Sequence, residues 1–349
     1  NPLGSIGNIK TCFNVVNNKL KYKKHVSNMN PGSEYKESFL HINHVGKYSR
    51  KFENIFNSII ACKGIVFVFS RFILHGIKSF AILLEENGFE RVDSSGKINN
   101  FLQKDTNINN KFCSKHNKYY RDLSEEERKT FKPARYIYLD GSLNKKELSD
   151  LVRKERGEGE ENNSNINGEE IKIILGSPVV EQGVSFHGVR EIHILDPWHH
   201  LNMLEQAAGR AIRNKSHFKL PKNKRNVTLY IHISALPEGN DSGNETLDER
   251  IYRKAYLKKK HMSLVERQLK VNSIDCILNK NGNIFLSSDY DNLLLVNNPL
   301  KNIEMTNSKG ENFVVNLSDN NFSMKCDFQK CQYMCSNTDN VSIEVSDLN

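Results

Sequence analysis

The sequence predicts an α/β protein whose main domain is a parallel sheet flanked by helices, and three observations carry this prediction. Several short apolar runs, rich in β-branched and aromatic residues, have the length of strands that are buried on both faces. Segments with apolar residues at helical spacing lie between these runs. Strand and helix signals alternate along the chain, as expected for βαβ units with right-handed crossovers.

The first strand and helix have the clearest pattern. Residues 64–69 are a continuous apolar run and predict a buried strand. Residues 72–87 place apolar side chains on one face of a helix, and Gly88 follows as its C-terminal stop. Later strands are expected at 134–139, 171–175, 191–195 and 227–233, and later helices at 143–156 and 201–213.

Composition divides the chain into four parts. These are a poorly specified lead-in (1–44), the α/β domain (45–235, with an insertion at 93–132), a helical extension (245–279) and a small irregular C-terminal region that contains cysteines (280–349). Residues 157–170 are low in complexity and predict a loop within the α/β domain.

The charge balance favours a polyanionic partner. The 349 residues include 50 Lys and Arg against 41 Asp and Glu, a net charge of +9. A general enrichment in Asn and Lys would give the same balance without such a partner, so charge leaves both alternatives open. No apolar run approaches the roughly 20 residues that a membrane span needs, and no secretory leader is recognisable. We expect an intracellular protein without a membrane partner. Because the first residue is Asn1, we interpret the chain as a fragment or a processed piece.

The cysteines have two interpretations. Seven cysteines, an odd number, in a large chain without a leader predict reduced thiols. Cys326, Cys331 and Cys335 are weak candidates for zinc, which needs four ligands. A fourth ligand could come from Cys276, Cys113 or His116. Free thiols are the favoured interpretation, and we assign no metal site.

The densest candidate chemistry lies in residues 173–213. One predicted strand ends in small residues at Ser177, where the backbone can approach a phosphate closely. A second ends at Asp196-Pro-Trp, at the sheet edge where open α/β proteins bind ligands. Arg210 and Arg213 then stand three residues apart on one predicted helix face. Guanidinium groups are suited to phosphoryl oxygens, although two arginines on a helix are more often simply solvated.

In their order and spacing these segments resemble the second RecA-like domain of superfamily 2 helicases. Residues 66–71 resemble motif IV, 138–142 the Leu-Asp-Gly-Ser segment of SNF2-like members, 176–186 motif V, and 206–213 motif VI (Q-x-x-G-R-x-x-R). The runs at 131–136, 274–279 and 326–335 are similar to SNF2-like helicases of nucleocytoplasmic large DNA viruses. That group includes the poxvirus early transcription factor small subunit and nucleoside triphosphatase I.

The resemblance implies two sets of site residues. In the first set, the arginine fingers Arg210 and Arg213 reach the γ-phosphate of ATP, while Gln206, Gly183 and Ser185 help to bind the nucleotide. In the second set, Ser177, Ser70 and Arg71 contact the nucleic-acid backbone. The basic segment 250–260 would add further phosphate contacts.

The resemblance also implies what the chain does. No G-x-x-x-x-G-K-[ST] loop and no DEAD or DEAH box occurs in it. We therefore expect the C-terminal half of an ATP-dependent DNA helicase or translocase, inactive alone, with ATP and Mg²⁺ bound mainly by an N-terminal RecA-like domain of the same protein. The implied partners are DNA or RNA and a viral RNA polymerase or transcription-factor subunit, in a viral factory, the host cytoplasm or the virion.

Two alternatives stay open. The first is a non-catalytic nucleic-acid-binding or interaction module that retains the RecA fold. The second is a cellular SNF2-type remodeller.

Overall fold

The computed structural model describes residues 12–23, 38–103, 107–156, 165–178, 184–236, 245–278, 303–315, 320–331 and 333–336. The chain forms two compact units. The first comprises Asn1–Trp198, Asn202–Arg250 and Met305–Asn312, and the second His199–Leu201, Ile251–Glu304 and Phe313–Asn349.

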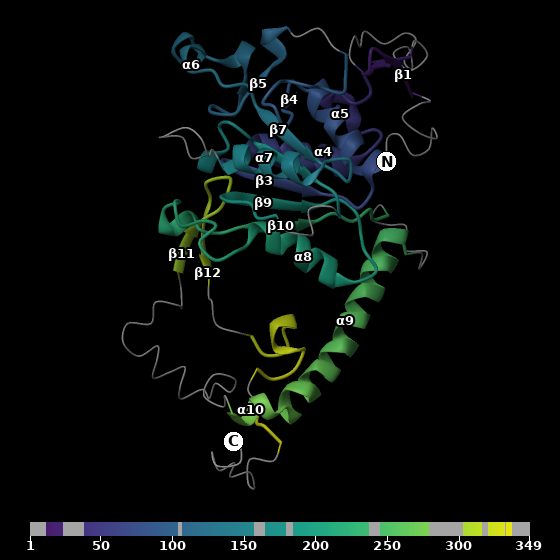
Figure 1. The fold of residues 1–349 in the computed structure, drawn as a ribbon, viewed down its shortest axis with the longest axis vertical. Coiled ribbons are helices and arrows are strands. Elements are labelled where there is room, and N and C mark those ends of the chain that lie inside the picture. Colours follow the sequence, from purple (N-terminus) through teal and green to yellow (C-terminus); the bar gives the residue numbers. More distant parts are fainter. Residues whose placement is uncertain are drawn as a thin grey trace. The chain divides into compact units, whose positions relative to one another are not determined.

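A six-stranded parallel sheet forms the centre of the first unit (Figure 1). Its strands lie in the order β10–β9–β3–β8–β7–β4. Their bounds are β3 Ile65–Phe69, β4 Glu90–Arg91, β7 Arg135–Leu139, β8 Ile173–Gly176, β9 Val189–Ile194 and β10 Thr228–Ile231. Strands β3 and β8 are buried along their whole length, as their unbroken apolar runs predict. Strand β9 is buried along its whole length although it contains Arg190, Glu191 and His193.

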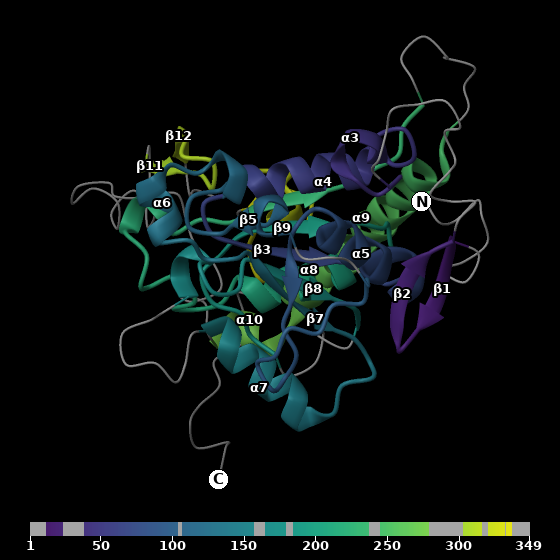
Figure 2. The same ribbon diagram turned by 90° about the horizontal axis from the view of Figure 1, so that it is seen from above.

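Helices cover both faces of this sheet. They are α3 Ile42–Val45, α4 Arg50–Ala61, a π-helical turn Ile73–Ile77 that leads into α5 Lys78–Glu86, α7 Lys145–Arg156 and α8 Leu201–Ala211. The crossover from β3 to β4 runs along the sheet in the opposite direction to those from β7 to β8 and from β9 to β10. Right-handed crossovers therefore put α5 on one face and α7 and α8 on the other. Figure 2 shows α4 and α7 on opposite sides of the sheet. The predicted fold class, a parallel sheet flanked by helices, is confirmed.

The main core lies between α4, α5 and one face of the sheet. Phe52, Ile55, Phe56 and Ile59 of α4 are buried in one cluster with the strand residues Val66 and Val68. Ser49 caps α4 by accepting a hydrogen bond from the Phe52 N–H at 3.3 Å. This helix was missed by the sequence analysis, although its apolar residues recur at the helical period.

Smaller elements surround the sheet. They are the hairpin β1 Phe13–Val16 and β2 Lys19–Tyr22, the hairpin β5 Phe112–Cys113 and β6 Lys118–Tyr119, helix α6 Glu125–Lys129, and the hairpin β11 Ile303–Thr306 and β12 Asn312–Val315. Short 3-10 turns lie at Ile108–Asn110, Tyr120–Asp122, Asn165–Asn167, Lys222–Lys224 and Met324–Cys326. Gly88, at φ +89°, follows α5 as predicted, and any Cβ there would lie 2.0 Å from the Asn110 carbonyl oxygen.

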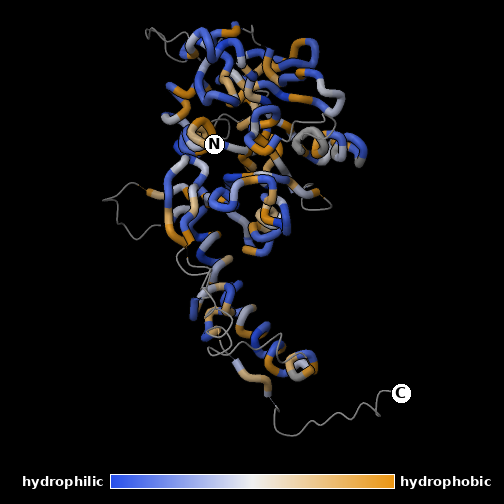
Figure 3. Tube along the Cα trace, turned by 90° about the vertical axis from the view of Figure 1, so that its left-hand side faces the viewer, coloured by the Kyte–Doolittle hydropathy of each residue, from blue (hydrophilic) through white to orange (hydrophobic). Residues whose placement is uncertain are grey.

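The second unit is built on a long helix. It consists of most of α9 Leu247–Asn272, then α10 Ile274–Leu278 and a short C-terminal segment. Figure 3 shows hydrophilic and hydrophobic residues interleaved along this part of the chain. Arg267 of α9 is buried and donates to Asp327 at 2.9 Å and to the Cys326 carbonyl at 2.8 Å. This pairing fixes the C-terminal segment on the helix.

Two disulfides close the same unit, Cys276–Cys335 and Cys326–Cys331. The prediction of reduced thiols is therefore wrong for four of the seven cysteines, while Cys12, Cys62 and Cys113 are buried and belong to no disulfide. The weak zinc candidates Cys326, Cys331 and Cys335 have no thiolate to offer a metal while these bonds are closed. Within the described residues no group of three or more His, Cys, Asp or Glu side chains is arranged to hold a metal ion. Spacing along the chain gave no signal of this pairing.

Two predicted helices differ in their limits. The predicted helix at 201–213 ends at Ala211, so Arg213 belongs to the turn that follows. The extension predicted at 245–279 is two helices, α9 and α10. None of the described helices is long and apolar enough to cross a membrane.

Candidate nucleotide and nucleic-acid sites

The ends of three strands bring polar residues together at the carboxyl edge of the sheet. Because all six strands are parallel, the residues that follow β3, β8 and β9 reach the same edge. The Ser70 N–H donates to the Gly176 carbonyl at 3.1 Å, and the Ser177 N–H donates to the Leu139 carbonyl at 3.0 Å. Ser70, Ser177 and Asp196 thus form a row across the central strands, at the place where open α/β sheets bind ligands.

Ser70 holds this edge together. Its side chain is fully buried, and its hydroxyl is hydrogen-bonded to Asp196 of the β9 exit. Gly76 lies directly beside it, since a Cβ at that position would come within 1.9 Å of the Ser70 Oγ. Burial raises the pKa of Asp196, and the Ser70 hydrogen bond acts against this rise. The Ser70–Asp196 pair links the exits of two neighbouring strands.

Arg71 is the accessible member of the predicted nucleic-acid set. Its guanidinium lies 4.4 Å from the centre of the Phe72 ring and 4.5 Å from that of Trp198. Such stacking uses the faces of the guanidinium and leaves its in-plane N–H groups for phosphate oxygens. Ser70 and Ser177, by contrast, are 0% and 1% exposed. Their side chains present no surface to a nucleic acid in this structure, which is a correction to their predicted role as direct contacts.

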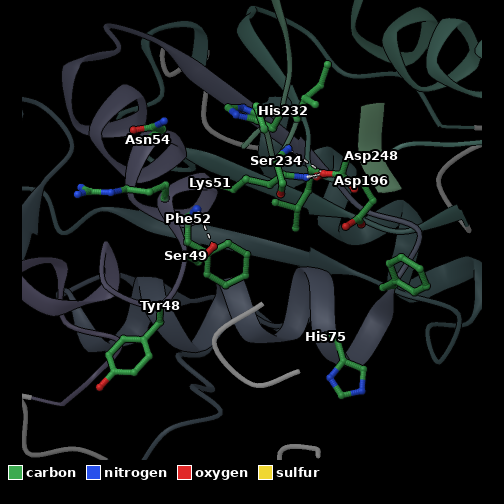
Figure 4. Close-up of a pocket in the computed structure, with 15 residues that line it drawn as sticks. Tyr48, Ser49, Lys51, Phe52, Asn54, His75, Asp196, His232, Ser234 and Asp248 are labelled. Carbon is green, nitrogen blue, oxygen red and sulfur yellow. Dashed lines mark hydrogen bonds and ion pairs between the residues drawn. The ribbon is translucent and has the colours of Figure 1, made fainter. Parts of the chain in front are cut away.

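A pocket of about 670 Å³ opens beside this row (Figure 4). Its walls come from the start of α4, the π-helical turn, the exits of β9 and β10, and the first turn of α9. Lys51 donates to the Leu195 carbonyl at 3.2 Å and forms an ion pair with Asp248. Asp248 also accepts from the Ser234 N–H at 2.9 Å. These bonds join α4, the strand exits and the start of α9 around one cavity.

A chain of buried polar side chains ends at this pocket. Glu191 Oε2 lies 3.0 Å from His193 Nε2, and His193 Nδ1 lies 2.9 Å from His232 Nε2. Burial is the main cause that lowers the pKa of His232 to about 4, so its imidazole is neutral near pH 7. The hydroxyls of Ser58 and Ser308 both donate to the Glu191 carboxylate. This carboxylate is buried, and these bonds satisfy its oxygens.

Arg210 and Ser185, two of the predicted nucleotide residues, lie close together. The Phe186 N–H donates to the Arg210 carbonyl at 2.9 Å, which attaches the segment after Ser185 to the end of α8. Arg210 is half-buried and Gln206 is exposed on the same helix. Gly183 lies outside the described residues.

Arg213 stands on a turn that is fixed by its neighbours. The Arg213 N–H donates to Ser216 Oγ at 3.2 Å, Ser216 Oγ lies 2.8 Å from His217 Nδ1, and His217 Nε2 lies 2.6 Å from the Val189 carbonyl. Burial lowers the pKa of His217 and favours its neutral form. The carbonyl needs a donor, so the proton is on Nε2 and Nδ1 accepts from the Ser216 hydroxyl. The backbone of Arg213 is thereby tied to the first residue of β9.

The two predicted sets lie at different edges of the sheet. Helix α8 begins after the carboxyl end of β9 and leads to the amino end of β10, so Arg213 lies at the amino edge. At about 3.3 Å per residue, a strand of five residues separates the two edges by roughly 17 Å. The structure therefore groups Ser70, Arg71 and Ser177 at one edge and Arg210, Arg213 and Ser185 toward the other.

One protein-family profile matches the central part of the chain. Residues 91–215 match the profile of the helicase conserved C-terminal domain. The match contains β7, β8, β9 and α8, and with them Ser177, Ser185, Arg210 and Arg213. Residues 91–215 are therefore similar to the helicase C-terminal family.

The relatives come from large DNA viruses. A mimivirus (Acanthamoeba polyphaga mimivirus) protein, R563, inferred to be an ATP-dependent RNA helicase, is 32% identical over 243 residues, which are 69% of this chain and 35% of that protein. The early transcription factor large subunit homolog of African swine fever virus (isolate Pig/Kenya/KEN-50/1950) is 28% identical over 195 residues, 56% of this chain and 16% of that protein. The predicted resemblance to viral helicases is confirmed. The chain spans about a third or less of the length of these relatives.

Among solved structures, the C-terminal part of the Fun30 ATPase domain is similar at 15% identity with a TM-score of 0.37. The similarity covers 61% of this chain and 50% of that one.

Sequence reasoning missed the residues that hold the site in place. Ser216 and His217 support Arg213, and Lys51 closes the pocket, but none of them belongs to a motif that the resemblance supplied. Ser216 and His217 follow Arg213 within four positions, so their proximity to a motif was the one available signal.

Proposed function

We propose that this chain is the second motor domain of an ATP-dependent nucleic-acid helicase or translocase of superfamily 2 that serves viral transcription. The observation that carries the proposal is the family match over residues 91–215, which includes Arg210 and Arg213 at the end of α8. The viral relatives support the same conclusion, since one is inferred to be an RNA helicase and another is a transcription factor homolog.

The donor set at the end of α8 fits the phosphate end of a nucleotide. Arg210 and Arg213 carry permanently charged, planar groups and stand three residues apart, at the end of α8 and just beyond it. The Arg210 carbonyl accepts a hydrogen bond from the Phe186 N–H. In this proposal both arginines act as fingers toward the γ-phosphate, and Gln206, Gly183 and Ser185 line the nucleotide. A first RecA-like domain of the same protein holds the remaining phosphates and Mg²⁺. ATP hydrolysis supplies the free energy for movement, and the arginines stabilise the charge that develops on the transferred phosphoryl group.

The carboxyl edge is the proposed nucleic-acid side. Arg71 offers in-plane N–H groups to a phosphate, whereas Ser70 and Ser177 shape the backbone that carries it. Contacts of this kind do not read bases, which suits a motor that moves along DNA or RNA. The further proposed partner is a viral RNA polymerase or transcription-factor subunit, in a viral factory, the host cytoplasm or the virion.

The test uses the protein that contains this chain together with its first motor domain. We expect ATP turnover that rises when DNA or RNA is added, and nucleic-acid binding that weakens steeply between 50 and 200 mM salt, because bound cations release counterions from phosphates. Turnover without any response to nucleic acid would contradict the motor. Binding without turnover would identify the alternative, a non-catalytic nucleic-acid-binding module.

A further inference from the structure

The loop between α8 and β10 is strongly basic. Residues 213–225 contain no Asp or Glu, and their cations are Arg213, Lys215, Lys219, Lys222, Lys224 and Arg225. Neither the predicted sites nor the proposed function uses the four lysines. The loop therefore carries a concentrated positive charge that has no assigned role.

Internal hydrogen bonds fix the backbone of this loop. Besides the bonds of Ser216 and His217, Arg225 donates to the Leu220 carbonyl at 2.8 Å and to the Phe218 carbonyl at 2.6 Å. Leu220 is buried, and Asn223 donates to Thr306 Oγ1 at 3.2 Å. A loop that is held in this way loses little conformational entropy when it binds a partner.

The fixed backbone displays cations around one aromatic ring. Lys215, Lys219, Lys222 and Lys224 are exposed and form no ion pair with the part of the chain that the structure describes. Phe218, in the middle of them, is 56% exposed. Arg225 holds the backbone of this loop through its hydrogen bonds, whereas the four lysines are exposed to solvent.

This combination selects one class of ligand. Lysine charges without acidic neighbours attract a polyanion. An exposed aromatic ring among them adds a stacking surface for a base, which an acidic peptide would not need. We infer that Lys215, Lys219, Lys222 and Lys224 bind the phosphate backbone of nucleic acid and that Phe218 stacks on an unpaired base. The inference rests on the proposed function, because it assumes a motor that holds nucleic acid.

The loop defines a second contact, separate from the one proposed at Arg71. His217 bonds to Val189 at the start of β9, so the loop lies at the amino edge of the sheet. The two edges lie roughly 17 Å apart, so contacts at both edges engage different stretches of the nucleic acid. The amino edge therefore guides a second stretch of the nucleic acid, such as a strand that has left the duplex.

The first arm of the test removes the lysine charge. A variant with Lys215→Gln, Lys219→Gln, Lys222→Gln and Lys224→Gln is titrated with a labelled single-stranded DNA of 30 nucleotides at several salt concentrations. Each lost phosphate contact lowers the slope of log K against log salt by about 0.7 on single strands, so we expect a decrease of roughly 3. The matched control changes four other exposed lysines, Lys21, Lys97, Lys115 and Lys129, to Gln. Equal slopes for the two variants would overturn the inference.

The second arm tests the ring. Phe218→Ser should weaken binding to single-stranded DNA by roughly 5- to 100-fold, in line with the cost of losing one stacked base. Binding to a blunt-ended duplex should weaken by less than twofold, because a duplex offers no unpaired base to the ring. An equal loss on both DNAs would overturn the stacking contact. Poly-glutamate serves as the competing probe: if the lysine variant loses binding to it but keeps its affinity for DNA, the partner is an acidic protein.

ATP turnover without nucleic acid separates this inference from the proposed function. The unmodified protein and the lysine variant should have the same basal turnover, since the four lysines have no part in the nucleotide site. If both proteins turn over ATP and the lysine variant binds DNA as tightly as the unmodified protein, the proposed loop contact is wrong and the proposed function stands. A protein that binds no nucleic acid at all overturns both proposals.

Discussion

The two edges of the sheet present their polar residues in opposite ways. At the carboxyl edge, Ser70 and Asp196 are turned inward and bond to each other, and Arg71 is stacked between two rings. At the amino edge, Ser216 and His217 are turned inward, and they hold a turn whose cations face solvent. In both places small polar residues fix the backbone beside cations that are proposed to meet the ligand. The difference is that Arg71 is partly covered by two aromatic rings, whereas the lysines of the amino edge are exposed.

The largest expected effect comes from Arg213 at the amino edge. Arg213→Ala in the protein with both motor domains should lower kcat for ATP by about 10³–10⁵, since a finger guanidinium stabilises charge only in the transition state. The thermal midpoint should change little, because the side chain is exposed. Turnover and melting are measured on the same samples. Turnover within tenfold of the unmodified protein would contradict the assignment of Arg213.

Ser216 tests whether the turn positions that arginine. Ser216→Ala removes the acceptor of the Arg213 N–H and the donor to His217. We expect a loss of kcat on the order of 10²-fold with a nearly unchanged KM, because a displacement of about 1 Å has that cost. Ser216→Thr keeps the hydroxyl and is the control. If the alanine variant loses affinity and not rate, Ser216 has a different role.

Asp196 tests the enclosed pair at the carboxyl edge. Asp196→Ala removes the acceptor of the buried Ser70 hydroxyl and leaves it the Phe72 carbonyl at 3.2 Å. We expect the free energy of unfolding to fall by about 1–3 kcal/mol in urea. Asp196→Asn keeps an oxygen acceptor and should lose less than half of this. Equal losses in the two variants would show that the hydrogen bond is not the source of the stability.

His232 gives the smallest expected effect, and it depends on pH. Its pKa is lowered from 6.5 to about 4 in the folded chain, so the unfolded chain binds the proton more readily. The contribution of His232 to stability is therefore complete above pH 6.5 and declines as the pH falls toward 4. Replacement by Asn should flatten the pH dependence of the free energy of unfolding in this window. An unchanged slope would mean that His232 is equally neutral in the unfolded chain.

The strand pattern of this domain could be predicted because burial on both faces requires unbroken apolar runs. Residues 64–69 and 171–175 were recognised in this way, and the observed strands β3 and β8 overlap them. The edge strand β4 was missed because it has only two residues, too few to show an alternation of apolar and polar side chains. Helix α4 was missed although its pattern was present.

The site could be predicted only as far as its motifs extend. Arg210 and Arg213 follow from Q-x-x-G-R-x-x-R, a spacing that is written along the chain. A motif does not indicate whether the side chains of its residues are exposed or buried in the folded protein. Ser70 and Ser177 were expected at a surface and are buried, because the strands that surround them and the neighbouring Asp196 occupy their side.

The sequence by itself determined the alternation of the main buried strands with helices, the family resemblance and the two arginines of the Q-x-x-G-R-x-x-R motif. Only the tertiary structure decided which residues support them. Ser70 is hydrogen-bonded to Asp196, 126 residues away in the sequence, and His193 to His232, 39 residues away. Cys276 pairs with Cys335 across 59 positions. Local patterns reflect the periods of helices and strands, whereas these contacts depend on which segments the folded sheet and helices bring together, and no spacing along the chain records that.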